Sequence, residues 1–334
     1  MRIATYNVEW FTELFDDDDK LRDDGGWSGR RDVTRAQQIK ALGDVFTALD
    51  ADAIMIIEAP DHNKNRSAVA ALEGFAAAFG LRAHKAVIGF SNNTQQEIAL
   101  LYDPAVLSAR HDPQATPEAP QFDQTLGIDL DVDETKDVVR FSKPPLELEV
   151  TTRSGTRLRL LGAHLKSKAP HGARNHDQVM KISIANRRKQ LAQAIWLRRR
   201  IVSHLVAGES LIVLGDLNDG PGLDEYEDLF GRSSVEIVLG EEGDNCLHDP
   251  HARQATRRRP GATPTTSRFY LSRQKRYLHA LLDYVMVSAD LRSKSPQWRI
   301  WHPFEDQECW DMPELREALV TASDHFPVTL DIDL

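Results

Sequence analysis

The 334-residue sequence is poor in cysteine, with only Cys246 and Cys309, which lie far apart. They form no CxxC spacing, so the sequence gives no support for a cysteine-rich zinc site or a dense disulfide framework. No apolar run is long enough to cross a bilayer, and the first residues have the pattern of a strand and not of a secretion signal. We therefore expect a soluble, cytoplasmic protein without membrane insertion. The composition predicts no particular oligomeric state.

Positive charge is also scarce, with 41 Lys and Arg against 51 Asp and Glu and a formal net charge of -10. General coating of nucleic acid is disfavoured, because such binding depends on neutralising phosphates with Lys and Arg. Residues 250–276 are the exception, since they contain eight Lys and Arg and no acidic residue. We expect a long surface loop here. It either contacts a polyanionic substrate such as nucleic acid, through Arg257, Arg258 and Arg259, or is a solvated loop.

Short apolar runs and two helical patterns alternate along the chain. Strands are expected at 2–8, 53–57, 98–102, 146–150, 158–163, 211–214, 281–287 and 328–332. Helices are expected from Thr34 to Leu49 and over 184–206. The Pro- and Asp-rich residues 109–137 are expected to form a surface excursion. Because no linker divides the chain, we expect a single domain over 1–334.

Polar side chains stand at or beside the ends of the apolar strands. They are Asn7, Glu58, His164, Asp216, Asn218, Asp283, Asp324 and His325. A single polar residue at a strand end is usually a helix cap or a turn residue. Open sheets, however, bring the ends of several strands together along one edge, where all of these side chains can converge. Oxygen donors with two imidazoles and no thiolate suit Mg²⁺ or Mn²⁺ better than a structural zinc. The pattern therefore predicts a divalent-metal site.

Six motifs in this order resemble the endonuclease/exonuclease/phosphatase superfamily. They are ATYNV at 4–8, IIE at 56–58, GAHLKSK at 162–168, GDLN at 215–218, LDYVMVS at 282–288 and SDHFPV at 323–328. The superfamily includes pancreatic-type deoxyribonucleases, abasic-site endonucleases, inositol polyphosphate 5-phosphatases and neutral sphingomyelinases. The resemblance implies an α/β fold, a four-layer sandwich of two mainly antiparallel β-sheets flanked by helices. One position departs from the pattern, because Ile57 stands before Glu58 where many relatives have Gln.

Phosphoester hydrolysis needs a positioned water, neutralised phosphate oxygens and help for the leaving group. The resemblance implies that Glu58 is the main metal carboxylate, with support from Asn7 and Asp324. It implies that Asp216 orients or deprotonates the attacking water. Asn218 would then donate its amide to a phosphate oxygen.

The resemblance assigns the remaining catalytic roles to two histidines and an aspartate. His325 would contact the phosphate or move a proton, with Asp283 fixing its ring. His164 would be the second imidazole on the phosphate. Whether Asp216 or His325 is the general base stays open.

Four further residues are candidates for substrate binding. Glu97 either orients His164 or is an ordinary surface acid. Arg140 precedes a strand in a place where relatives carry an Arg, and we expect it near the site. Lys166 and Lys168 either reach the phosphate or are solvated loop lysines.

Together these features predict divalent-metal-dependent hydrolysis of phosphoester bonds, by a nuclease-like phosphodiesterase. An alternative is a phosphatase or phosphodiesterase of a small molecule or a lipid headgroup. The lipid version is less favoured because no amphipathic membrane-binding stretch or lipid anchor is present. A more remote alternative is a non-catalytic binding protein on the same fold, although every expected catalytic position keeps a competent residue.

Overall fold

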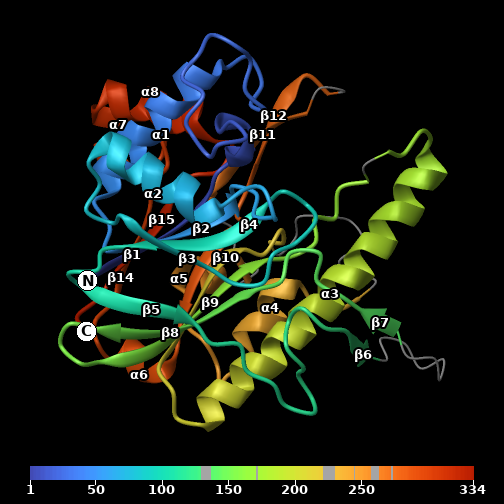
Figure 1. Ribbon diagram of the computed structural model, residues 1–334. Coiled ribbons are helices and arrows are strands. Elements are labelled where there is room, and N and C mark those ends of the chain that lie inside the picture. Colours follow the sequence, from blue (N-terminus) through green and yellow to red (C-terminus); the bar gives the residue numbers. More distant parts are fainter. Residues whose placement is uncertain (129–136, 171, 221–229, 244, 257–262, 272–273) are drawn as a thin grey trace.

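The computed structural model describes residues 1–334 except 129–136, 171, 221–229, 244, 257–262 and 272–273. Two large β-sheets lie face to face at its centre (Figure 1). The first sheet has the order β14 (Gln297–Ile300), β15 (Val328–Asp331), β1 (Arg2–Asn7), β2 (Ala53–Ala59), β4 (Glu97–Tyr102) and β3 (Lys85–Ile88). The second has the order β13 (Asp283–Val287), β10 (Leu211–Asp216), β9 (Arg157–His164), β8 (Leu146–Thr152) and β5 (Leu107–His111).

Helices cover the outer face of each sheet (Figure 1). Over the first sheet lie η1 (Phe11–Leu14), α1 (Arg35–Leu49), α2 (Ala68–Phe79), α7 (Gln307–Asp311) and α8 (Pro313–Ala322). Over the second lie α3 (His176–Val206), α4 (Ser234–Leu239) and α5 (Pro250–Thr256), while α6 (Ala289–Arg292) follows β13. Two small hairpins complete the described elements, β6 (Leu126–Ile128) with β7 (Asp137–Val139) and β11 (Ser267–Leu271) with β12 (Arg276–Ala280). The predicted four-layer sandwich is confirmed.

Each large sheet contains one parallel pair of strands among antiparallel neighbours. β1 pairs in parallel with β2, and β9 pairs in parallel with β10. A parallel pair needs a crossover, and the crossovers contain α1 and α3. Because parallel neighbours end at the same edge, the residues that end these strands come together in each sheet. Contacts of β1 and β2 with β10 bring the two sets close to each other.

The core between the sheets is formed by alternate apolar side chains of both. Met55 and Leu100 of the first sheet pack in the same cluster as Leu160 and Leu214 of the second. The sheets approach closely at Gly162, where an added Cβ would lie 2.4 Å from Met55 Sδ. A side chain at Gly162 would therefore displace the Met55 side chain, which packs on it from the facing sheet.

The helix predicted after Thr34 is confirmed as α1. The Thr34 side chain accepts a hydrogen bond from Gln37 N, and the Gln37 side chain accepts one from the Thr34 backbone, which is a capping box. The apolar face of this helix, including Leu42 and Phe46, is buried on the first sheet. The local sequence and the tertiary packing agree here, so this helix was predictable.

Helix α3 differs from its prediction in length and in burial. It begins at His176 and not at 184, because Asn175 caps it. Arg187 and Arg200 are fully buried, although the basic pattern suggests a solvated face. The guanidinium of Arg200 is neutralised by Glu147 at 3.5 Å and donates to the carbonyl of Ala119 at 2.7 Å. This helix carries charge along its length, and no helix in the described part of the chain is long and apolar enough to span a bilayer.

Two predicted surface segments also contribute to the structure. Within 109–137, Phe122 and Leu126 are buried, and the Phe122 ring packs 5.9 Å from that of Trp196 on α3. The expected loop at 250–276 contains α5 and β11 in its described residues. Both predictions of irregular surface were therefore wrong in part, because the partners that cover these short segments are distant in sequence.

A buried charge network joins β8 to α3 and gives a prediction about stability. Glu147 lies 2.6 Å from His204 Nε2 and 3.5 Å from Arg200 Nε. Glu147→Gln is expected to lower the free energy of unfolding by about 3 kcal/mol, because it leaves the buried Arg200 guanidinium without its counter-charge. Glu149→Gln on the same strand is the matched control. Its partner Arg110 is exposed, so the loss should stay below about 1 kcal/mol. Urea denaturation measures both, and equal small losses would contradict the structural role of Glu147.

Candidate active site

A cavity of about 930 Å³ opens at the edge where β1, β2, β9 and β10 end. Of the eight polar residues predicted to converge, seven line it: Asn7, Glu58, His164, Asp216, Asn218, Asp324 and His325. Asp283 lies behind His325 and is fully buried. The strand-end pattern therefore marks one real cavity.

The backbone is unusual at two of these residues. Glu58 has φ 60° and Asn218 has φ 51°, both in the left-handed region that non-glycine residues rarely adopt. Glu58 also stands at a β-bulge, where the β2–β4 register shifts between Ile57 and Ala59. Each such conformation costs about 1 kcal/mol or more and persists only where the surroundings impose it. The bulge places the Glu58 carboxylate at the cavity although the strand continues past it.

Asp216 is held by hydrogen bonds on both carboxylate oxygens. Its Oδ2 accepts from Asn7 Nδ2 at 3.0 Å and from Asn218 Nδ2 at 3.1 Å, and its Oδ1 accepts from Asn218 N at 2.7 Å. The second amide hydrogen of Asn218 is donated to the Leu165 carbonyl at 3.1 Å. Asn218 therefore orients Asp216, and its amide is not free for the phosphate contact that was expected.

Both histidines lie near the Asp216 carboxylate. Its Oδ2 is 3.7 Å from His164 Nε2 and 4.0 Å from His325 Nε2. Strand pairing produces this cluster, because Asp216 is the register partner of His164 on β9 and of Asp283 on β13. Burial raises the pKa of Asp216 to about 7, and the nearby Asp283 adds to this rise.

His325 and Asp283 are in direct contact. His325 Nδ1 lies 2.7 Å from Asp283 Oδ2, and Thr266 Oγ1 donates to the same oxygen at 2.7 Å. Burial disfavours the imidazolium, but the Asp283 carboxylate outweighs it and raises the pKa of His325 well above its usual value. The Asp283 contact therefore favours the protonated ring of His325. His164 has the opposite character, because burial, with Lys143 nearby, lowers its pKa well below the ordinary value.

Lys143 is a cavity residue that the sequence did not reveal. Its Nζ lies 3.2 Å from His164 Nδ1, and burial lowers its pKa. Arg140, which was expected near the site, has an exposed side chain and does not line the cavity. The reason is Phe141, whose buried ring fixes the register of this segment and leaves Arg140 outside. In the sequence, the feature that could have identified Lys143 is its position directly before two prolines and the start of β8.

Gln96, the residue directly before β4, reaches the cavity, and Glu97 does not. Gln96 Nε2 donates to Glu58 Oε2 at 2.7 Å, so it holds the carboxylate that lacks the usual preceding glutamine. The Glu97 carboxylate accepts instead from Asn92, at 2.8 Å for the side-chain amide. No contact between Glu97 and His164 is present in the described residues, so the orienting role expected for Glu97 is wrong. The antiparallel alternation of side chains sends these two neighbours to opposite sides.

The remaining substrate-binding candidates have different surroundings. Lys166 lines the cavity and donates to the Ser167 carbonyl at 3.2 Å. Lys168 also lines it, but its ammonium pairs with the buried carboxylate of Asp219, which ties this loop to the loop after β10. Residues 257–259, the expected arginine contacts, lie outside the described residues.

The residues around Glu58 fit a divalent cation. Asn7 Oδ1 is buried at the cavity and accepts no hydrogen bond from any described group. Burial raises the pKa of Glu58, and it raises that of Asp324 to about 7, because it outweighs the nearby Lys143 and His325. Hard oxygen donors of this kind suit Mg²⁺ or Mn²⁺. Nearby, ligand atoms of Asp216, Asp283 and His325 lie within 4.8 Å of one another, but the His325–Asp283 hydrogen bond already occupies two of them.

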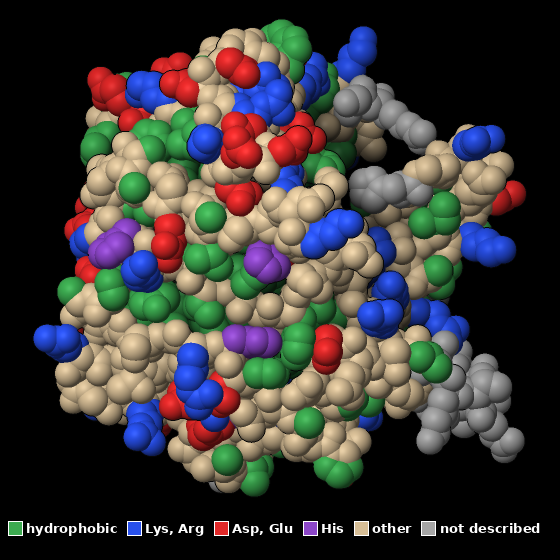
Figure 2. All heavy atoms as spheres, in the orientation of Figure 1, with side chains coloured by type: hydrophobic (Ala, Val, Ile, Leu, Met, Phe, Trp, Pro, Cys, Tyr) green, Lys and Arg blue, Asp and Glu red, His purple; other side chains and the backbone are tan. Residues whose placement is uncertain are grey.

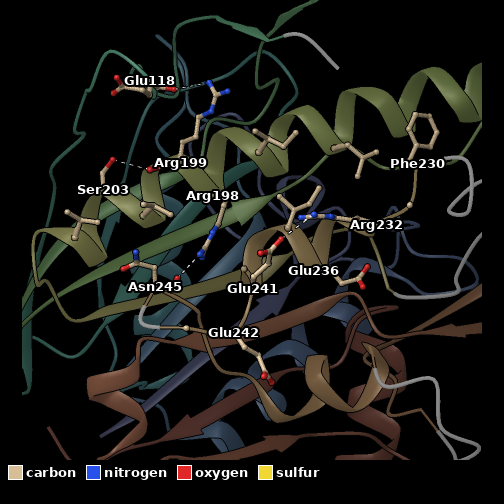
Figure 3. Close-up of a pocket in the computed structure, with 18 of the residues that line it drawn as sticks. Glu118, Arg198, Arg199, Ser203, Phe230, Arg232, Glu236, Glu241, Glu242 and Asn245 are labelled. Atoms are coloured by element: carbon tan, nitrogen blue, oxygen red, sulfur yellow. Dashed lines mark hydrogen bonds and ion pairs between the residues drawn. The ribbon is translucent and has the colours of Figure 1, made fainter. Parts of the chain in front are cut away.

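A second hollow of about 1330 Å³ lies beside α3 and α4 (Figure 3). Its floor includes Leu191 and Ile237, and charged groups surround it. Arg198 donates to the Asn245 carbonyl at 2.6 Å across one end. None of the predicted site residues lines this hollow, so it is not the catalytic candidate.

The comparisons with known proteins agree with the fold. The profile of the endonuclease/exonuclease/phosphatase family matches residues 4–325, whereas no curated protein matches the sequence. The 3' phosphatase NExo from Neisseria, solved with a product DNA hairpin, is similar with a TM-score of 0.50 and 16% identity over 100% of both chains. Truncated TDP2 from Caenorhabditis elegans has a TM-score of 0.51 and 15% identity over 98% of this chain and 96% of that chain. At these identities the likeness concerns the fold alone. The chain belongs to the endonuclease/exonuclease/phosphatase family, whose members are hydrolytic phosphoesterases.

Proposed function

We propose that this chain is a divalent-metal-dependent phosphodiesterase of the nuclease type. The observation that carries the proposal is the pairing of a fixed carboxylate and a fixed cation in one cavity. Asp216 is anchored by two amides, and the His325 ring lies 4.0 Å from it, held by Asp283. This arrangement places a proton acceptor and a proton donor side by side, within reach of one bound phosphate, as hydrolysis by water requires.

Asp216 accepts the proton of the attacking water in this proposal. Asn7 and Asn218 fix the orientation of the Asp216 carboxylate. The carboxylate then directs the water oxygen at phosphorus and accepts the proton of the water. When bound, a divalent cation neutralises the non-bridging phosphate oxygens and helps to ionise the water. The new P–O bond forms as the bond to the leaving oxygen breaks. His325, kept protonated by Asp283, suits the role of donor to that oxygen and not of base.

Lys143 and His164 are the proposed contacts of the phosphate oxygens. Lys143→Gln is expected to lower kcat/KM about tenfold or more, because a hydrogen bond to a charged group contributes about 1.4 kcal/mol or more. Arg140→Gln, three residues earlier and exposed, is the matched control and should leave kcat/KM unchanged. Steady-state kinetics on a simple phosphodiester measure both. An equal loss in the two variants would contradict the placement of Lys143.

A substrate panel tests the proposal as a whole. It contains plasmid DNA, single-stranded DNA, RNA, an abasic duplex, inositol phosphates and a simple phosphodiester, each with Mg²⁺, Mn²⁺ or excess chelator. We expect cation-dependent cleavage of a polynucleotide. Hydrolysis of inositol phosphates alone would favour the small-molecule or lipid-headgroup alternative. No turnover on any member would favour a binding protein on this fold.

A further inference from the structure

The β11–β12 hairpin has two chemically different faces. It projects from the body beside the catalytic cavity (Figure 1). Phe269 and its cross-strand partner Leu278 line the cavity, as does Leu271. Side chains alternate along a strand, so the neighbouring partners Tyr270 and Tyr277 face the other way. One short element therefore belongs both to the cavity wall and to an outer surface.

The hairpin is attached directly to catalytic residues. Arg268 N donates to the Asp324 carbonyl at 2.7 Å, and Ser267 forms a β-bridge with His325. The Phe269 ring packs edge-on against that of His325, with centroids 5.3 Å apart. A chain bound on the outer face is therefore held at a fixed position relative to the reacting groups.

The outer face carries a row of alternating arginines and rings. Arg31 Cζ lies 3.8 Å from the Tyr270 ring centroid, Tyr270 and Tyr277 are 5.2 Å apart, and Arg268 Cζ lies 3.4 Å from Tyr277 and 5.6 Å from Phe304. We name these five residues the arginine–ring row. Tyr277 and Phe304 are 47% and 42% exposed, so their rings are open to a ligand.

The charge of this surface is positive although the chain is acidic. Arg268 forms no ion pair with a described residue, and its guanidinium lies over the Tyr277 ring. Arg31 is 3.1 Å from Asp32, which lies at the edge of the row. Lys and Arg gather along the side where the hairpin and the projecting end of α3 lie (Figure 2). Phosphates are the natural ligands of such unpaired cations.

We propose that the arginine–ring row binds unpaired nucleotides of a polynucleotide whose phosphodiester lies in the catalytic cavity. This inference rests on the proposed function and names its substrate class. Exposed rings stack with bases of any sequence, and the arginines contact the intervening phosphates. An acidic peptide would use the cations but not the rings. A compact phosphate ester would fill the cavity without crossing the edge of the hairpin.

The test measures binding of a fluorescent single-stranded oligonucleotide by anisotropy, in chelator so that no cleavage occurs. Tyr277→Leu is expected to weaken binding about fivefold or more, because one base loses its stacking partner. Arg268→Gln should reduce the log–log salt slope by about 0.7, the value for one single-strand phosphate contact. Tyr102→Leu is the matched control, since Tyr102 ends β4 at the end away from Glu97 and does not line the cavity. It should bind like the wild type.

Two results would overturn the inference. The first is unchanged oligonucleotide affinity in Tyr277→Leu. The second is an equal loss of affinity for heparin in this variant, because heparin has charge but no bases, and the ring would then act only through the fold. Hydrolysis of a simple phosphodiester by the wild type is a separate measurement. If that hydrolysis is absent while Tyr277→Leu weakens oligonucleotide binding, the reaction is refuted and the binding surface stands.

Discussion

Replacing Asp216 with asparagine is expected to lower kcat by roughly a hundredfold or more, the range for loss of a positioned proton-transfer group. An amide cannot take the proton of water. Its NH₂ group would also face the donors of Asn7 and Asn218, which now share one carboxylate oxygen. The measurement is kcat at saturating simple phosphodiester and Mg²⁺, together with a thermal melt to show that the variant folds.

Asp249→Asn is the matched control for this prediction. Asp249 is another fully buried carboxylate, accepts from Val285 N at 3.0 Å, and has a pKa raised to about 6 by burial. It does not line the cavity, so its replacement should change stability and leave kcat within about threefold of the wild type. Equal losses of kcat in the two variants would show that burial, and not proton transfer, explains the effect at Asp216.

Excess chelator is expected to abolish turnover, and added Mg²⁺ or Mn²⁺ to restore it. The physical reason is the group of Asn7, Glu58 and Asp324, in which the Asn7 oxygen accepts no hydrogen bond from a described group and burial raises the pKa of both carboxyls. Glu58→Gln should raise the dissociation constant for Mn²⁺ at least about tenfold, since the change removes a negative ligand and keeps its shape. Titration calorimetry without substrate measures this constant independently of activity.

Glu97→Gln provides the control for the metal prediction. Glu97 is buried on the neighbouring strand and is bound by Asn92, so its replacement should leave the affinity for Mn²⁺ unchanged. Full turnover in chelator would refute the dependence on a cation. Wild-type affinity in Glu58→Gln would show that Glu58 is not a ligand.

The sequence predicted that the polar side chains of the site lie close together, because they stand at the ends of strands that share one edge. Asn7 and Asp216 each end an apolar run that forms a buried strand, and parallel neighbours place such ends at one edge. Lys143 was not predictable in the same way. Its position depends on the burial of Phe141 against Trp196, a contact between residues far apart in sequence. The resemblance to the superfamily placed Arg140 near the site instead, three residues too early.

The fold was predictable where local pattern and packing agree, as in α1. It was not predictable where a long-range partner changes the environment of a side chain. Arg200 has the local pattern of a solvated helix residue, and Glu147 on β8 makes its burial possible. Phe122 lies in a Pro- and Asp-rich stretch, and α3 covers it. In both cases the deciding contact joins residues about 50 or more positions apart, which no local window contains.

The hydrogen bond between Asn7 and Asp216 joins the two sheets, because Asn7 ends β1 and Asp216 ends β10. The orientation of the proposed base therefore depends in part on how the two sheets pack, although Asn218 holds the same carboxylate from its own strand. We expect substitutions in the core between the sheets, such as one at Gly162 beside Met55, to lower turnover as well as stability.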